Sequence, residues 1–166
     1  MYERPRDPEW AFMVTGYSEC IDSFFAFGLF ETAKRSGFFP EELVDTFEPV
    51  VHEEGRHILF FVNWVAWWRR NMPWWRRPYF EAKVLAVWAF LIWERIGIAQ
   101  DVGNGEQDNN FTLNGADHLG DGISVGKLMQ TCLSENDRRL RIYDKRLKRP
   151  RFVPFMIRQI RRFIPD

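Results

Sequence analysis

The spacing of apolar side chains along the chain predicts an all-α protein. In four long stretches, apolar residues recur every three or four positions, which is the period of an amphipathic helix. Glycine and proline residues such as Gly37, Pro73 and Pro150 stand where these stretches end. The stretches cover about 9–35, 40–71, 79–100 and 125–148. No linker or repeat divides the chain, so we expect one domain over residues 1–166, folded as an up-down four-helix bundle.

Two segments are not part of the predicted helices. The bundle as a whole covers about residues 9–148. Residues 101–123 are rich in glycine, asparagine and aspartate, and they are too many for an ordinary structureless connection. We expect them to form a long loop between the third and fourth helices that covers a functional site or carries a short element. Residues 149–166 form a basic C-terminal tail. From Arg138 to Arg162 there are eleven lysines or arginines and one acidic residue.

Each predicted helix carries a carboxylate on its apolar face. In chain order these are Glu19, Glu54, Glu94 and Glu135. His57 follows Glu54 by three residues, so the two side chains share a face of the second helix. A carboxylate and an imidazole buried together are costly unless something pairs them. A metal ion is an economical partner, because it takes both side chains as ligands at once.

The same residues allow simpler interpretations. A shift of one residue in the phase of the second helix would place Glu54 and His57 on the surface as an ordinary pair. Glu94 alone could form an ion pair with Arg95 or Arg35. The evidence for a metal site therefore lies in the occurrence of carboxylates on four consecutive helices, and not in any one of them.

The combination of Glu19 with Glu54-Gly55-Arg56-His57, which begins 35 residues later, resembles the first half-motif of the ferritin-like di-iron carboxylate superfamily. In that superfamily one helix gives a Glu, the next gives Glu-x-x-His, and a second helix pair repeats the pattern. The resemblance covers about residues 9–148 and implies a centre of two iron ions, with manganese as an alternative metal. The metal ligands that it implies are Glu19, Glu54, His57, Glu94 and Glu135.

The second half-motif departs from the family pattern. Glu135-Asn136-Asp137-Arg138 has arginine where the family has histidine, and arginine cannot ligate a metal because it stays protonated. Three interpretations stay open. His118 or Asp22 replaces the missing ligand; or one metal is bound and Arg138 supplies the missing positive charge; or the metal is lost and Arg138 neutralises an inherited acidic cluster.

The resemblance implies a metal-dependent oxidoreductase that activates dioxygen toward a small apolar organic substrate, with Glu54, His57 and Arg138 at the catalytic centre. The aromatic content of 17% is compatible with an apolar pocket. Two other functions stay open. One is a non-catalytic bundle with a degenerate metal site that acts as a binding or interaction protein, in which Arg138 is expected to point at Glu94 or Glu135. The other is a membrane-associated hydroxylase similar to the demethoxyubiquinone hydroxylases.

Composition and charge limit the partners and the compartment. Lysine plus arginine equals aspartate plus glutamate at 23 each, and no known motif suggests nucleic acid as a partner. Two cysteines, Cys20 and Cys132, are expected in the core of a cytoplasmic protein, and the N-terminus has no signal-peptide apolar core. The longest apolar run, Val84–Trp93, is too short to span a bilayer.

A band of tryptophan and arginine residues occupies positions 64–77. Tryptophan and arginine together are typical of membrane surfaces and protein interfaces. The simpler interpretation is that half of the tryptophans are core and the arginines are solvated helix ends. The alternative is a peripheral membrane contact or a homodimer contact through this band.

Overall fold

The computed structural model describes residues 7–37, 39–103 and 124–163, and within these ranges it contains helices and turns but no strand. The α-helices are α1 (Pro8–Ser36), α2 (Glu41–Asn71), α3 (Arg77–Gly103), α5 (Val125–Arg141) and α6 (Phe152–Ile160). Two short 3-10 helices are η1 (Trp74–Arg76) and η2 (Arg161–Phe163). The prediction of an all-α protein is confirmed.

Local sequence explains where the helices begin and end. The Asp7 side chain accepts a hydrogen bond of 3.0 Å from the backbone N–H of Trp10, which caps the first turn of α1. Gly37 ends α1 with a positive φ of 66°, a conformation that costs glycine little. Ser124 caps α5 through the backbone N–H of Lys127 at 3.2 Å. These capping residues match the predicted starts and stops of the helices.

The fourth predicted helix ends earlier than expected, at Arg141 and not near residue 148. Asp144 accepts hydrogen bonds from both the backbone and the guanidinium of Arg146, which closes a turn in place of the next helical turn. Arg149 then folds back and donates to the carbonyl of Leu140 at 3.0 Å, which satisfies part of the C-terminal end of α5. The 142–151 segment therefore leaves the helix and leads to α6.

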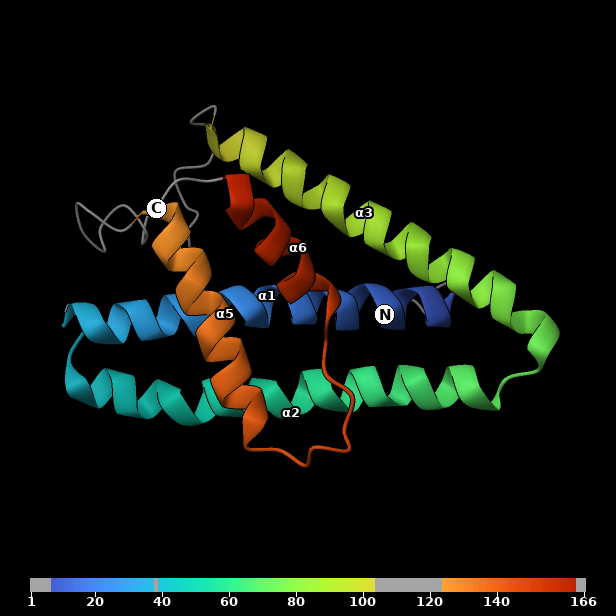
Figure 1. Cartoon of the computed structure of the whole chain (residues 1–166), viewed down its shortest axis with the longest axis horizontal. Helices are drawn as coiled ribbons and strands as arrows, with labels where there is room; N and C mark the ends of the chain where they lie inside the picture. Colours follow the sequence, from blue (N-terminus) through green and yellow to red (C-terminus); the bar gives the residue numbers. More distant parts are fainter. Residues whose placement is uncertain (1–6, 38, 104–123, 164–166) are drawn as a thin grey trace, which may run out of the picture.

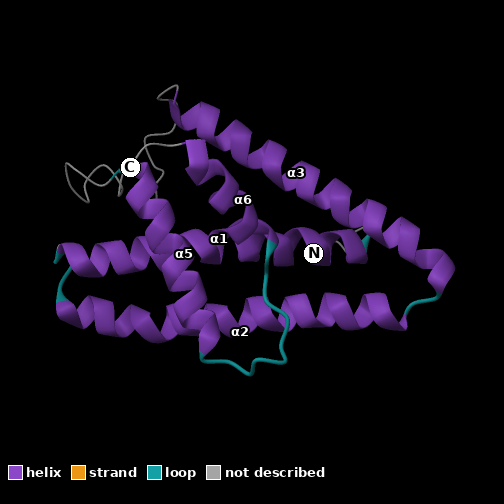
Figure 2. Ribbon diagram, in the orientation of Figure 1, coloured by secondary structure: helices purple, strands orange, loops and turns teal. Residues whose placement is uncertain are grey.

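α1 is central to the arrangement and contacts α2, α3, α5 and α6 (Figure 1). α1 and α2 lie side by side and run in opposite directions. α3 diverges from α1 toward its own C-terminal end, and α5 crosses α1 and α2 steeply (Figure 2). Helices that are parallel in space stay parallel in every projection, so these crossings show real angles between the axes. The predicted up-down bundle is therefore not confirmed, although a single set of packed helices is present.

Two clusters of buried side chains hold the helices together. The larger cluster joins α1, α2 and α3, and the smaller one joins α1 to α5 and α6. Gly28 on α1 allows the crossing of α5, because a Cβ atom there would come within 2.7 Å of the Cα of Cys132. Cys20 and Cys132 are both buried, as predicted for core residues. Steric fit at a glycine therefore fixes where α5 meets α1.

Part of the predicted long loop lies outside the described residues. Residues 104–123, which include His118, fall in the range that the structure does not describe. Residues 101–103, predicted as the start of that loop, belong to α3.

Candidate functional site

Glu54 and His57 lie on the outer side of α2. Glu54 Oε2 is 3.6 Å from His57 Nδ1, and the His57 side chain is 61% exposed. The buried face of α2 passes instead through Gly55 and Ile58. Gly55 belongs to that face because Tyr143 packs on it, and a Cβ at this position would lie 3.2 Å from the Tyr143 ring. The prediction that Glu54 and His57 share the apolar stripe is therefore wrong by one residue in helical phase.

Glu19 and Glu94 lie on α1 and α3, and neither faces a shared acidic cluster. Glu94 Oε2 is 3.1 Å from the guanidinium of Arg95, as the simpler interpretation expects. Arg95 also lies 2.8 Å from Asp22 on α1, so this arginine ties α3 to α1. Glu19 is half-buried, and within the described residues it makes no side-chain hydrogen bond or ion pair.

Glu135 is buried on α5, and its charge is balanced by arginine. Arg138 donates to both carboxylate oxygens of Glu135, from Nε at 2.9 and 3.0 Å and from Nη2 at 2.6 Å. A two-pronged bond of this kind is among the stronger interactions between side chains. The arrangement supports the third open interpretation, in which Arg138 neutralises an acidic side chain.

Arg139 is the most enclosed charge in this region, with a side chain only 4% exposed. Its Nη1 lies 3.0 Å from Glu48 Oε1 on α2, and its Nε lies 3.5 Å from Glu135 Oε2. On α1, the rings of Phe27 and Phe30 lie 5.5 and 5.7 Å from its guanidinium carbon. One cation therefore contacts three helices where α5 crosses, and we call Arg139 with Glu48 and Glu135 the crossing network.

The crossing network favours the charged form of Glu48. Burial raises the pKa of Glu48, but the hydrogen bond and the charge of Arg139, with Lys34 and Arg138, outweigh it and hold the pKa below 4.5. Sequence analysis did not include Glu48 or Arg139 in the site. The available clue was the pair Arg138-Arg139 one helical turn after Glu135, while the partner on α2 has no signature in the sequence.

The five predicted metal ligands do not come together in this arrangement. Among residues 7–37, 39–103 and 124–163, no group of three histidine, cysteine, aspartate or glutamate side chains is placed to hold a metal ion. Glu135 is paired with Arg138, and the side chain of His57 is 61% exposed. No protein-family model, no curated protein and no solved structure matches this chain. The ferritin-like assignment and its ligand set remain predictions.

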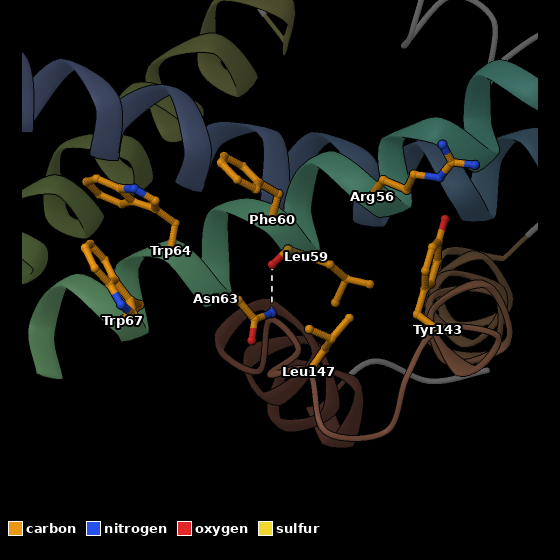
Figure 3. Close-up of a pocket in the computed structure, with 8 residues that line it drawn as sticks. All are labelled: Arg56, Leu59, Phe60, Asn63, Trp64, Trp67, Tyr143 and Leu147. Atoms are coloured by element: carbon orange, nitrogen blue, oxygen red, sulfur yellow. Dashed lines mark hydrogen bonds between the residues drawn. The ribbon is translucent and has the colours of Figure 1, made fainter.

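A mostly apolar groove of about 440 Å³ lies beside α2, where the segment after α5 passes (Figure 3). Asn63 holds that segment in place, because it donates to the carbonyl of Lys148 and accepts from its N–H, both at 2.9 Å. The groove is lined by Arg56, Leu59, Phe60, Asn63, Trp64, Trp67, Tyr143 and Leu147. Arg56 is its one charged lining residue, so the groove suits apolar contact better than acid–base catalysis.

The tryptophan and arginine band divides into a packed part and an exposed part. Trp64 and Trp68 stack with ring centroids 5.6 Å apart, and the Trp68 indole donates to Glu9 at 3.0 Å. Trp74 and Trp75, on η1, are both exposed. The simpler interpretation thus describes part of the band, while the turn between α2 and α3 presents two tryptophans to the outside.

The outer face of α3 is also apolar. From Pro78 to Ile96, every exposed residue of this helix is apolar or aromatic. Leu85 and Trp93 are the most exposed among them, and the Trp93 residue is 72% exposed. Tryptophan and leucine are costly to leave in water in such a continuous stripe.

Two cationic side chains of α3, Lys83 and Arg95, reach toward α1 and its N-cap. The side chains of Glu81 and Glu94 are 44% and 41% exposed. Lys83 donates to Asp7 and Glu9 at 2.8 Å each, and its side chain is largely buried. Further along α3, Arg95 reaches Asp22. α3 is therefore apolar on both sides, since Phe80, Val87 and Leu91 are buried in the core and the residues exposed on its outer face are apolar as well.

Proposed function

We propose that this chain is a helical binding protein that docks on an anionic membrane surface with the outer face of α3 and the adjoining η1 turn. The observation that carries the proposal is the exposed apolar face of α3, which adds to the apolar face that this helix packs into the core. A helix whose cationic side chains form ion pairs within the protein, and whose exposed stripe is continuously apolar, is typical of a surface that meets an apolar medium or partner. Within the described ranges, no helix combines the length and apolar character needed to cross a membrane, so the docking is peripheral.

The residue types at the ends of the stripe favour a membrane as the occupant. Trp75 at one end and Trp93 at the other are exposed, and tryptophan prefers the depth of the lipid headgroups. Four arginines surround the η1 turn, namely Arg69, Arg70, Arg76 and Arg77. Two of them, Arg69 and Arg76, are paired with Glu81 and Glu9, and the charge of the other two complements anionic headgroups.

The crossing network supports a binding function over a catalytic one. A catalytic carboxylate needs a free lone pair or an exchangeable proton at the reacting atom. Glu135 instead has both oxygens bound by Arg138, with Arg139 beside it. Its arginine contacts are those of a side chain that holds helices together, which agrees with the non-catalytic alternative.

We expect wild-type protein to co-sediment with vesicles of phosphatidylglycerol and phosphatidylcholine. The double variant Leu85→Ser/Trp93→Ser should lower the bound fraction at a given lipid concentration by at least about tenfold, because burial of each side chain contributes about 2 kcal/mol. Trp74→Ser/Trp75→Ser should weaken binding in the same way. A vesicle sedimentation assay over a range of lipid concentrations measures both.

The matched control is Phe47→Ser/Phe60→Ser, which removes two exposed apolar side chains from α2 and should leave vesicle binding unchanged. If the control loses as much vesicle binding as the α3 variants, any exposed apolar side chain promotes sedimentation, and the assignment of the membrane contact to α3 is wrong. A different outcome is that the wild type does not bind vesicles, forms a dimer in solution, and becomes a monomer in the Leu85→Ser/Trp93→Ser variant. In that case a second copy of the chain covers α3, and the membrane proposal is overturned.

A second candidate is the metal-dependent oxidoreductase that the resemblance implies. The observation that favours it is the proximity of Glu54 and His57, whose side chains lie 3.6 Å apart on the open side of α2. Two such groups offer an oxygen and a nitrogen donor to an incoming cation. This candidate remains a prediction, and metal analysis tests it directly.

If the metal prediction holds, protein produced with added iron and manganese should contain close to stoichiometric metal. His57→Ala and Glu54→Ala should each remove most of it, since each variant loses one ligand. Elemental analysis by mass spectrometry gives the stoichiometry. Glu53→Ala is the matched control, because it removes a neighbouring exposed carboxylate that pairs with Arg56. Unchanged metal content in both ligand variants would rule out the assignment.

A further inference from the structure

A second cavity, of about 540 Å³, opens where α5 ends and α6 begins. We call it the α5–α6 pocket. It lies between the last turns of α5, the 142–151 segment and the first turns of α6, and so on different elements from the apolar stripe of α3. Five of its lining residues are cationic: Arg141, Lys145, Arg149, Arg151 and Arg158.

Most of this positive charge is not compensated within the pocket. The one carboxylate in the lining is Asp137, whose Oδ2 lies 3.6 Å from Arg158. In the part of the chain that the structure describes, the side chains of Arg141, Lys145 and Arg151 make no ion pair or hydrogen bond. Like charges gathered around a concave surface raise the local potential and attract an anion.

Hydrogen bonds from Arg149 hold the backbone that surrounds the pocket. Its guanidinium donates to the carbonyls of Leu140 and Tyr143 at 3.0 and 3.1 Å, and a further bond of 3.0 Å reaches the carbonyl of Leu147. These bonds fix the path of the 142–151 segment, which carries Lys145 on the pocket rim. The positive side chains therefore stand on a segment held in one conformation.

Asn136 adds an observation that is independent of charge. This residue lines the pocket, is only 3% exposed, and forms no side-chain hydrogen bond with any described residue. Its amide atoms have no partner in the described part of the protein and yet are not fully enclosed, so they reach the open space of the pocket. Its N–H₂ group is a donor available to an oxygen inside the pocket.

We propose that the α5–α6 pocket binds a phosphate-bearing ligand. Lys145 and Arg151 supply compensating charge, and Asn136 donates to a phosphate oxygen. Phe155 and Pro154 form an apolar wall beside the cations, which suits the organic part of the ligand. Phosphate is the anion class that fits best, because several donors arranged around a cavity match its several acceptor oxygens. The phosphate belongs either to a free phosphorylated compound or to a phospholipid headgroup.

The test uses inorganic pyrophosphate as the free probe, titrated calorimetrically into the full chain. Lys145→Gln/Arg151→Gln should weaken binding by at least about tenfold, because it removes two charge-assisted contacts. Asn136→Leu keeps the size of the side chain and removes its donor, so it should also weaken binding. Arg161→Gln/Arg162→Gln is the matched control: it makes the same change in net charge outside the pocket. Thermal unfolding of each variant checks that the fold is kept.

A second arm distinguishes the two sources of phosphate. Pyrophosphate binding that depends on Lys145 and Arg151 assigns a free phosphorylated ligand. If binding to phosphatidylglycerol vesicles depends on Lys145 and Arg151 and binding to pyrophosphate does not, the ligand is a phospholipid headgroup. Equal losses in the pocket variant and in the Arg161/Arg162 control would show a general charge effect and overturn the proposal. So would the absence of any Lys145/Arg151 dependence in both arms.

Discussion

Gly28→Ala is expected to lower the free energy of unfolding by about 3 kcal/mol, the upper part of the usual range for overpacking. A Cβ at position 28 would lie 2.7 Å from the Cα and 2.8 Å from the backbone N of Cys132. These are backbone atoms of α5, so the clash cannot be relieved by rotating a side chain. In an isolated helix the same change would add about 1 kcal/mol of stability. Urea unfolding followed by circular dichroism measures the sign and the size.

Gly97→Ala is the matched control for this experiment. Gly97 lies inside α3, and no atom comes within 4 Å of a Cβ placed there. The control should therefore gain about 0.5–1 kcal/mol from helix propensity alone. If Gly28→Ala is also stabilising, α5 does not cross α1 at this glycine, and a bundle with more nearly parallel helices becomes the better description.

The helices themselves could be predicted well from the sequence, and the reason is local. Their ends are set by residues such as Asp7, Gly37 and Ser124, whose capping chemistry acts within a few positions of the chain. The early end of α5 was missed because its cause is the set of hydrogen bonds that Arg146 donates to the carboxylate of Asp144. The free energy of that turn differs little from the free energy of one more helical turn. A hydrophobic pattern gives no information about so small a difference.

The phase of α2 could not be predicted, because its apolar residues do not lie on one side. Phe47 and Val50 are exposed, while the buried face includes Gly55, which adds nothing to a hydrophobic pattern. What buries Gly55 is Tyr143, a residue that comes from the segment after α5. The contact between Tyr143 and Gly55 therefore determines which face of α2 is buried, and Glu54 and His57 turn outward as a result.

The acidic site was predicted in part. Glu135 was expected to be buried and is buried, and its bond to Arg138 was among the open interpretations. The most deeply buried cation of the site, Arg139, pairs with Glu48, which lies about 90 positions earlier in the chain, a separation that loop-closure entropy tolerates. A pattern of spacings within one helix contains no information about such a partner.

Arg139→Met is expected to destabilise the protein by about 3 kcal/mol. Methionine preserves the bulk of the side chain against Phe27 and Phe30 but leaves the carboxylate of Glu48 without its nearest cation. Glu135 keeps only its contacts with Arg138. The cost is chiefly that of uncompensated buried charge. Arg138→Met is the matched control. Since the Arg138 side chain is 57% exposed, its loss should cost about 1 kcal/mol or less.

A double variant separates the loss of charge balance from the loss of packing. Arg139→Met/Glu48→Leu removes the anion that Arg139 contacts most closely together with the cation, and apolar replacement of a buried ion pair is often close to neutral. We therefore expect the double variant to recover most of the stability lost by Arg139→Met, as measured by urea unfolding. If the double variant is less stable than Arg139→Met, the side chains contribute through packing and the crossing network is not an electrostatic one.

The stability deficit of Arg139→Met should depend on pH through Glu48. In the folded wild type the pKa of Glu48 lies below 4.5, because Arg139 and its neighbours outweigh the effect of burial. A carboxyl group with a depressed pKa stabilises the fold above its unfolded pKa, and that contribution is lost as pH falls through the folded pKa. Without Arg139, burial dominates and raises the pKa of Glu48, so its charge is a cost at neutral pH that protonation removes. The difference between wild type and Arg139→Met should thus be largest near about pH 7 and shrink below about pH 4.5. A difference that stays constant over this range would show that Glu48 is not part of the network.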